Sequence, residues 1–189
     1  MSTTAKMKMK ADDFLIWAEA QDGRWELHDG AVVAMSPERV SHVRTKGLVF
    51  QALTAAISRA RLPCEAFSDG VSVRVADGSV YEPDAVVHCG SRLPEDAIEV
   101  SNPIIVVEVV SPSTAARDHG VKLAGYFSLA GVAHYLILDP ERRVVIHHKR
   151  GSGEVIETRI LSSGVLHLDP PGLEVTVADI FVAPQPSTI

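Results

Sequence analysis

A single carboxylate interrupts the most apolar segment of the chain. Glu108 stands within residues 103–110, a run of valine and isoleucine typical of a strand buried on both faces of a sheet. A carboxylate there is unfavourable unless it pairs with a cation or coordinates a metal ion. A second carboxylate, Asp84, stands at the start of the apolar part of the preceding predicted strand. If the two strands are neighbours, Asp84 and Glu108 converge, and two hard oxygen ligands that leave room for water and phosphate are what Mg²⁺ prefers.

Each carboxylate also has a simpler interpretation. Glu108 taken alone is a buried glutamate tied to an arginine or a lysine. Asp84 taken alone is a turn residue after Pro83. The pair is more informative than either member.

The cation that would assist such a site must come from another element. Residue 110 shares a strand face with Glu108 and is the natural place for a second polar group, but it is valine. The next predicted helix carries Asp118, Lys122 and Tyr126 at a spacing of four residues, which forms a polar stripe. Lys122 is therefore the candidate catalytic cation. The alternative is an Asp118–Lys122 ion pair at the surface, which contributes little.

Composition limits the classes of protein that remain. The chain has 189 residues, of which 46% are hydrophobic and 22% charged, and this balance excludes collagen-like, coiled-coil and mostly disordered chains. The net charge of −6 argues against a protein that coats nucleic acid non-specifically. It leaves open an enzyme that contacts DNA locally.

The cysteines and the apolar runs indicate where such a protein works. Cys64 and Cys89 are too few for a disulfide scaffold and have no zinc-finger spacing. The longest apolar run is far too short to span a bilayer, and the basic N-terminus does not lead into an apolar signal region. The sequence therefore predicts a cytoplasmic protein without a membrane partner and with both cysteines reduced.

Helix and strand signals alternate along one expected domain over residues 11–182, between a flexible leader (1–10) and a flexible tail (183–189). Antiparallel strands followed by a crossover helix predict an α/β fold with a mixed sheet flanked by helices. Asp29-Gly30 predicts an extra N-terminal hairpin, and further short strands near the C-terminus predict hairpins there. The central elements expected are a helix over 38–60 that begins at Ser36-Pro37, strands over 65–75, 79–88 and 103–110, a helix over 115–130 and a strand over 133–138.

Five short motifs, in this order and spacing, resemble the Uma2 family of the PD-(D/E)XK restriction-endonuclease-like superfamily. The resemblance covers roughly residues 10 to 180. The motifs are Glu-Leu-His-Asp-Gly (26–30), Glu-Pro-Asp (82–84), Val-Val-Glu-Val-Val-Ser-Pro-Ser-Thr (106–114), Asp118 with Lys122 and Tyr126, and Tyr-Leu-Ile-Leu-Asp-Pro (135–140).

The resemblance implies a restriction-endonuclease-like core of helix, three strands, helix and strand, and a Mg²⁺-dependent endonuclease for which Mn²⁺ is expected to substitute. Asp84 and Glu108 would be the acidic residues of the motif and would bind the metal ion together with the carbonyl of Val109. The superfamily usually has lysine where this chain has Val110. The family resemblance moves that role to Lys122, which would orient the attacking water or stabilise charge on the phosphate.

Two further residues are candidates for the site. Glu26, in the matching family segment, would complete the metal shell or hold Lys122; the alternative is a hairpin residue ion-paired with Arg24 or a neighbour. His42 lies on the same helical stripe as Val49, where the family implies a histidine facing the site; the alternative is a half-buried structural histidine. His134 and the His147–His148 pair are interpreted as structural.

Nucleic acid, with DNA favoured, is the expected partner, and a homodimer is a candidate assembly. The basic residues that could contact phosphates, or simply form a solvated surface, are Arg39, Arg44, Lys46, Arg142, Arg143, Lys149 and Arg150. A second hypothesis is a catalytically idle protein of the nuclease fold that serves as a binding or oligomerisation module. Val110 and the net charge of −6 favour that alternative.

Overall fold

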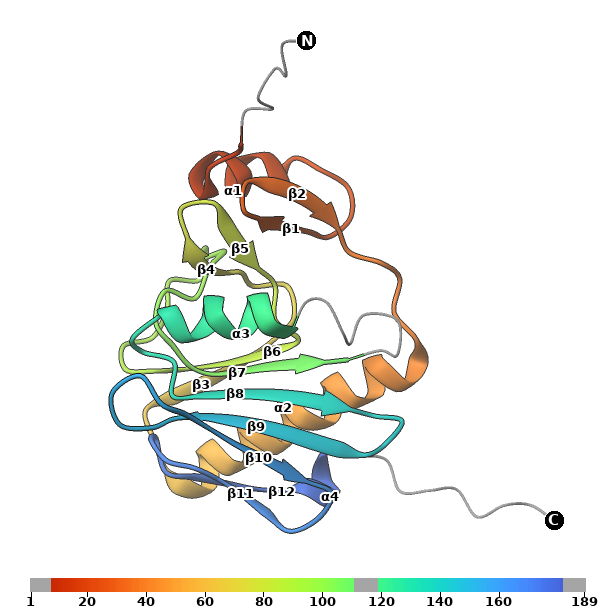
Figure 1. The fold of residues 1–189 in the computed structure, drawn as a ribbon, viewed down its shortest axis with the longest axis vertical. Coiled ribbons are helices and arrows are strands. Elements are labelled where there is room, and N and C mark those ends of the chain that lie inside the picture. Colours follow the sequence, from red (N-terminus) through yellow and green to blue (C-terminus); the bar gives the residue numbers. More distant parts are fainter. Residues whose placement is uncertain (1–7, 111–118, 182–189) are drawn as a thin grey trace, which may run out of the picture.

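A six-stranded mixed sheet runs through the centre of the computed structural model, which describes residues 8–110 and 119–181 (Figure 1). Its strand order is β10-β9-β8-β7-β6-β3, and every neighbouring pair is antiparallel except β7 and β8. Helix α3 lies between these two strands in the chain, as a parallel pair requires a crossover. The strands are β3 (Cys64–Ser68), β6 (Ala85–Cys89), β7 (Pro103–Val109), β8 (His134–Asp139), β9 (Val144–Arg150) and β10 (Ile156–Leu161).

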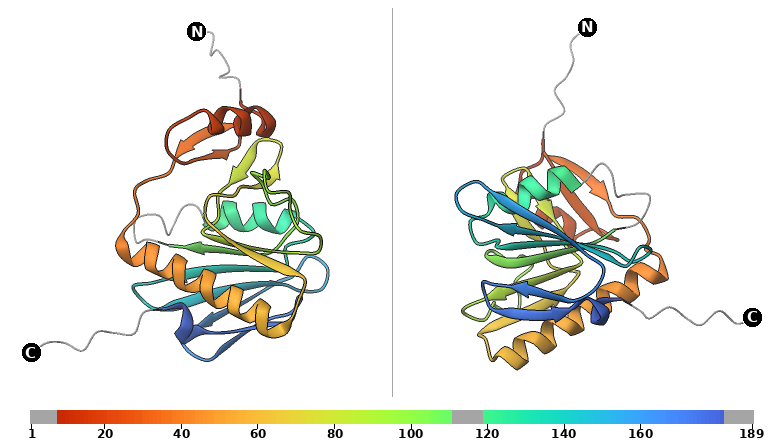
Figure 2. Two further views of the ribbon diagram at one scale, coloured as in Figure 1. Left: turned by 180° about the vertical axis from the view of Figure 1, so that it is seen from behind. Right: turned by 60° about the horizontal axis from the view of Figure 1, so that its bottom comes forward.

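Two helices cover opposite faces of this sheet (Figure 2). Helix α2 (Val40–Ala60) packs on one face, and α3 (His119–Ser128) packs on the other. Side chains of β7 alternate between the two cores: Ile105 and Val107 pack with α2, whereas Val106 packs with α3. By the same alternation Glu108 lies on the α3 side, where a lysine of that helix can meet it.

Two smaller sheets extend the central one. Strands β1 (Trp25–His28), β2 (Ala31–Ala34), β4 (Val73–Ala76) and β5 (Ser79–Tyr81) form a sheet with the order β2-β1-β5-β4, against which α1 (Ala11–Glu19) packs. Asp29 and Gly30 turn the β1–β2 hairpin with φ of 48° and 80°, the left-handed conformation that Asp-Gly favours. Strands β11 (Val165–Leu168) and β12 (Leu173–Thr176) pair with each other, and with α4 (Val177–Ile180) they join the α2-side core.

The predicted fold class is confirmed, although two predicted strands are divided. Residues 65–75 contain β3 and β4, and residues 79–88 contain β5 and β6, so in each case the chain changes sheets. Gly70, with φ of 102°, and Pro83, which lacks a backbone donor, stand at the two breaks. Within the central sheet the order is still α2, then β3, β6 and β7, then α3 and β8.

Other boundaries also differ from the prediction. Helix α2 begins at Val40 rather than 38, without a side-chain cap at its start, so Ser36-Pro37 is not its N-terminus. Helix α3 ends at Ser128 rather than at residue 130. Its predicted start, together with residues 1–7 and 182–189 of the expected leader and tail, lies outside the described residues. None of the described helices is long and apolar enough to cross a membrane.

The prediction that both cysteines are reduced is wrong for this structure. Cys64 of β3 lies directly opposite Cys89 of β6 in the antiparallel register, and the two form a disulfide. The residues are 25 positions apart and belong to strands that are not consecutive in the chain. Their pairing follows from strand order, which their spacing in the sequence does not indicate.

Candidate active site

Asp84 immediately precedes β6 and lies next to the C-terminal end of β7. The β6–β7 register pairs Ala85 with Val107, and its continuation by one residue brings Asp84 opposite Glu108. The Asp84 carboxylate is buried and accepts a hydrogen bond of 2.6 Å from the backbone N–H of Val109. Burial alone would raise the pKa of Asp84, but the hydrogen bond from His42 and the nearby positive charges outweigh burial and lower it. Asp84 is therefore held as a carboxylate.

Glu108 is tied to helix α3. Its Oε1 accepts hydrogen bonds from the Lys122 ammonium at 2.9 Å and from the Tyr126 hydroxyl at 2.6 Å. Burial raises the pKa of Glu108 more than Lys122 lowers it, and the charges of Asp84 and Glu26 add to the rise, so the pKa reaches about 7. The simpler interpretation of Glu108, a glutamate tied to a lysine, thus describes its contacts, and the lysine is the predicted catalytic one.

Glu26 joins the β1 hairpin to this cluster. Its Oε1 accepts hydrogen bonds of 2.9 Å from both the Lys122 ammonium and the backbone N–H of Glu82. Its Oε2 lies 2.8 Å from Nε2 of His28. Both interpretations of Glu26 therefore describe part of its contacts: it holds Lys122, and it also pairs with a hairpin neighbour, His28. Arg24 pairs with other carboxylates. The Asp118–Lys122 pair involves a residue outside the described part of the chain.

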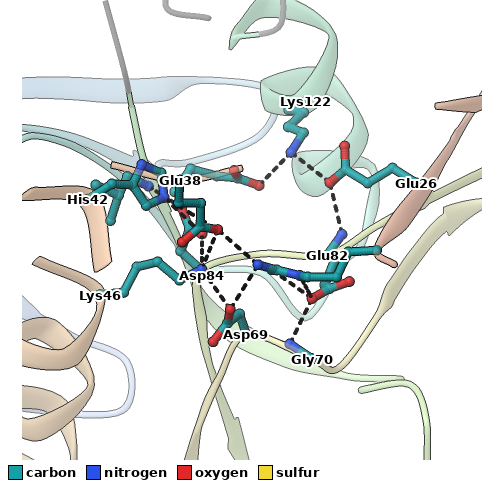
Figure 3. A network of polar contacts seen from close by, with 12 residues as sticks. Glu26, Glu38, His42, Lys46, Asp69, Gly70, Glu82, Asp84 and Lys122 are labelled. Carbon is teal, nitrogen blue, oxygen red and sulfur yellow. Dashed lines mark hydrogen bonds and ion pairs between the residues drawn. The ribbon is translucent and has the colours of Figure 1, made fainter. Parts of the chain in front are cut away.

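A second charged network, which the sequence reading missed, adjoins Asp84 (Figure 3). The Lys46 ammonium lies 3.1 Å from Asp84, 2.8 Å from Glu38 and 2.7 Å from Asp69. Arg24 pairs with Glu38 and Asp69 and also contacts Glu82, at 2.7 Å. On the α2 side of the site, two cationic side chains thus lie between carboxylates that each of them contacts.

One signal in the sequence could have revealed this network. Glu38, His42 and Lys46 recur every four residues, the same spacing as Asp118, Lys122 and Tyr126. Residues four apart share one face of a helix, which places His42 and Lys46 together on α2, whereas Glu38 lies just before the first residue of that helix. His42, a predicted site residue, follows this rule: its Nε2 lies 3.4 Å from Oδ1 of Asp84.

Two of the basic residues proposed for DNA contact are not available for it. The Lys46 side chain is only 6% exposed and is held by three carboxylates. The Arg150 guanidinium donates to backbone carbonyls of Phe127, Leu129 and Val132. Arg39, in contrast, is 65% exposed and lines the pocket of the site.

These side chains open into one pocket of about 590 Å³. Its lining includes all five predicted site residues and Val109. Among the described residues, Glu38, His42 and Asp84 bring three potential metal-ligand atoms within 4.8 Å of one another. The pocket thus combines hard oxygen donors, the imidazoles of His28 and His42 and a buried ammonium, a donor set suited to a divalent cation and an anionic substrate.

The fold is that of a mixed α/β protein, in which helices cover both faces of a six-stranded mixed sheet. The Uma2 family model, described as "Putative restriction endonuclease", matches residues 11–180, and the chain belongs to this family. An uncharacterized protein of Synechocystis sp. is 27% identical over 180 residues, 92% of each chain.

The fold is also that of a solved structure. A "putative nuclease belonging to DUF820" from Anabaena variabilis superposes with a TM-score of 0.71 and 17% identity, over 91% of this chain and 97% of that one. At this identity the likeness concerns the fold alone.

Proposed function

We propose that the protein is a metal-dependent endonuclease that hydrolyses phosphodiester bonds in nucleic acid, with DNA as the first substrate to test. The observation that carries the proposal is the convergence of Asp84 and Glu108, from the ends of adjacent strands, on a pocket that also contains Lys122. Family membership supports the same class of reaction.

The residues of the pocket fit a divalent cation. Burial raises the pKa of Glu108 to about 7 although Lys122 opposes the rise, and the charges of Asp84 and Glu26 add to it. A cation bound beside Glu108 would favour its carboxylate form. The described contacts to Glu108 all use Oε1. We propose that Asp84, Glu108 and the carbonyl of Val109 hold Mg²⁺, or Mn²⁺ in its place. Such an ion, when bound, polarises a phosphoryl oxygen and lowers the pKa of a bound water.

Lys122 is the proposed assisting cation. Burial alone lowers the pKa of Lys122, but the charges of Glu108 and Glu26 outweigh it and raise the pKa above its ordinary value. The side chain therefore stays an ammonium, and two carboxylates fix its Nζ at the pocket. In this position it would orient the attacking water or stabilise charge on the phosphate. Arg39 at the exposed rim is the proposed contact for a neighbouring phosphate.

The rival function is a catalytically idle member of the fold that binds or assembles without hydrolysis. Val110 at the usual lysine position and the net charge of −6 favour it. A metal ion that binds only the native state must raise the melting temperature, whereas an idle domain without a metal site gives no such rise.

Plasmid cleavage with Mg²⁺ and then Mn²⁺ separates the two functions. We expect nicking or linearisation by the wild type, with loss in Asp84→Asn and Glu108→Gln. Asp77→Asn is the matched control, because the Asp77 side chain is 71% exposed and outside the pocket lining. Cleavage that survives both site variants would overturn the residue assignment. Absence of cleavage together with absence of a metal-dependent melting shift would favour the idle module.

A further inference from the structure

Strand β10 ends the central sheet and leaves one edge without a partner strand among the described residues (Figure 1). It pairs with β9 along Ile156–Leu161, and five of its six side chains are exposed. Ile156 is 37% exposed and Ile160 is 72% exposed. An open edge with exposed isoleucines is a template for pairing with another strand, and soluble proteins usually block such edges.

The sequence of β10 is complementary to itself when it is reversed. Residues 156–160 read Ile-Glu-Thr-Arg-Ile. An antiparallel pair of two copies, with a two-fold axis at Thr158, places Ile156 opposite Ile160 and Glu157 opposite Arg159. The axis produces each of these contacts twice, as an isologous interface requires. Opposite charges and paired β-branched side chains in directly opposed positions stabilise antiparallel strands.

The backbone fits the same register. In an antiparallel ladder, alternate residues direct their N–H and C=O groups toward the same neighbouring strand. The register pairs 156 with 160, 157 with 159 and 158 with itself, so even-numbered residues oppose even-numbered ones and odd oppose odd. Groups directed outward on one copy therefore oppose outward-directed groups on the other.

The charged side chains of β10 are available for this contact. Neither Glu157 nor Arg159 forms an ion pair of 4.0 Å or less with another residue in the described part of the chain. Both lie in the run of exposed residues 156–160. We infer that β10 is the interface of a homodimer, in which two copies pair edge to edge about Thr158 and their central sheets become one continuous sheet. This inference does not depend on the proposed nuclease activity.

Charge reversal with rescue tests the register. Sedimentation analysis of the wild type across a concentration series should reach about twice the 20.3 kDa chain mass. In a dimer of Arg159→Glu each new glutamate would lie opposite Glu157 of the other copy, and in a dimer of Glu157→Arg each new arginine would lie opposite Arg159 of the other copy. Each variant alone should therefore be monomeric. The double variant Glu157→Arg/Arg159→Glu restores both pairs and should dimerise again. A mixture of the two single variants should form a heterodimer, because the mixed pairs are again Glu–Arg.

The outcomes separate this dimer from its rivals. Arg92→Glu is the charge-reversal control, because Arg92 is 74% exposed and follows β6, which is far from β10 in the strand order, and it should leave the dimer intact. Loss of dimer in both single variants without recovery in the double variant or the mixture would overturn the register. A wild-type monomer at every concentration would overturn the homodimer and leave the edge to a strand of a different protein. Near-wild-type melting temperatures of the variants would show that they are folded.

Cross-linking gives an independent readout. Thr158→Cys places two thiols opposite each other across the axis and should form a covalent dimer on mild oxidation. Glu157→Cys should form much less, because its direct partner is residue 159. Native Cys64 and Cys89 are already paired and do not compete. Equal cross-linking at both positions would contradict an axis at Thr158.

Discussion

The ammonium of Lys122 lies 2.9 Å from Oε1 of Glu108, although the two residues belong to different elements, α3 and β7. This contact connects the lysine that the sequence singled out with the buried strand carboxylate. It exists because β7 turns Glu108 toward the face that α3 covers.

Replacement of Lys122 by methionine should remove activity and lower stability together. The change leaves Glu26 and Glu108 buried without their shared cation, and loss of one partner from a buried ion pair costs about 3–5 kcal/mol. Urea unfolding measures the loss. Lys10→Met is the control, because the Lys10–Asp77 pair is exposed and should contribute under about 1 kcal/mol. Equal stability of Lys122→Met and the wild type would show that the contact is not formed in solution.

The metal ion should depend on Glu108 more than on His42. The alternative ligand group needs Glu38, and Lys46 already bonds Oε1 of Glu38, the same oxygen that lies 4.0 Å from Nε2 of His42. We therefore expect Glu108→Gln to abolish the Mg²⁺-dependent rise in melting temperature. His42→Asn should keep most of that rise. The reverse result would place the ion among Glu38, His42 and Asp84, the alternative group of candidate ligands.

A buried histidine pair should make stability fall in acid. His134 Nε2–H donates to the carbonyl of Pro170, so His134 Nδ1 accepts the 2.9 Å hydrogen bond from His147 Nε2–H, and both rings are neutral. Burial lowers the pKa of each histidine from 6.5 to about 4, with the charge of the neighbouring histidine adding to the effect at His147. Between pH 6.5 and pH 4 the unfolded chain binds more protons than the folded chain. The stabilisation that comes from the neutral pair is therefore present above pH 6.5 and is lost as the pH falls toward 4.

Comparison of His147→Gln with the wild type isolates the pH-dependent part of the stability that His147 contributes. Between pH 7 and pH 4.5 the wild type should lose about 2 kcal/mol more than the variant, as pKa shifts of this size imply. His167→Gln is the control, because the His167 side chain is 64% exposed on β11. Urea unfolding at the two pH values gives the comparison. Parallel losses in the wild type and His147→Gln would contradict the neutral pair.

Gly125→Ala should destabilise α3 despite the better helix propensity of alanine. A Cβ at Gly125 would lie 2.9 Å from Cε2 of Tyr81 and 3.2 Å from Cγ2 of Val75, where the helix packs on the small sheet. Overpacking of this kind costs about 1–3 kcal/mol. Gly47→Ala, in the middle of α2 with open space around the added methyl, should instead stabilise by up to about 1 kcal/mol. Thermal unfolding would contradict this packing if both variants gained stability.

The site could be predicted in part because burial patterns carry chemical information. Glu108 within a valine-rich strand is unfavourable unless paired, and this cost is visible without a structure. Lys122 and Tyr126 share a helix face by their spacing, and both reach Glu108. The same helical rule applies to His42 and Lys46 of α2, but basic residues on a long helix resemble a solvated surface until their burial is known.

The sequence by itself determined the α/β class, the succession along the chain of the elements that build the central layers, the carboxylates next to β6 and within β7, and the lysine that meets them. These features depend on local periodicity and on the cost of burying charge, which act within single elements. Only the tertiary structure decided that two predicted strands divide between sheets, that Cys64 meets Cys89, and that Lys46 is buried against Asp84. Each of these depends on which distant segments become neighbours, and strand order rather than residue type determines that.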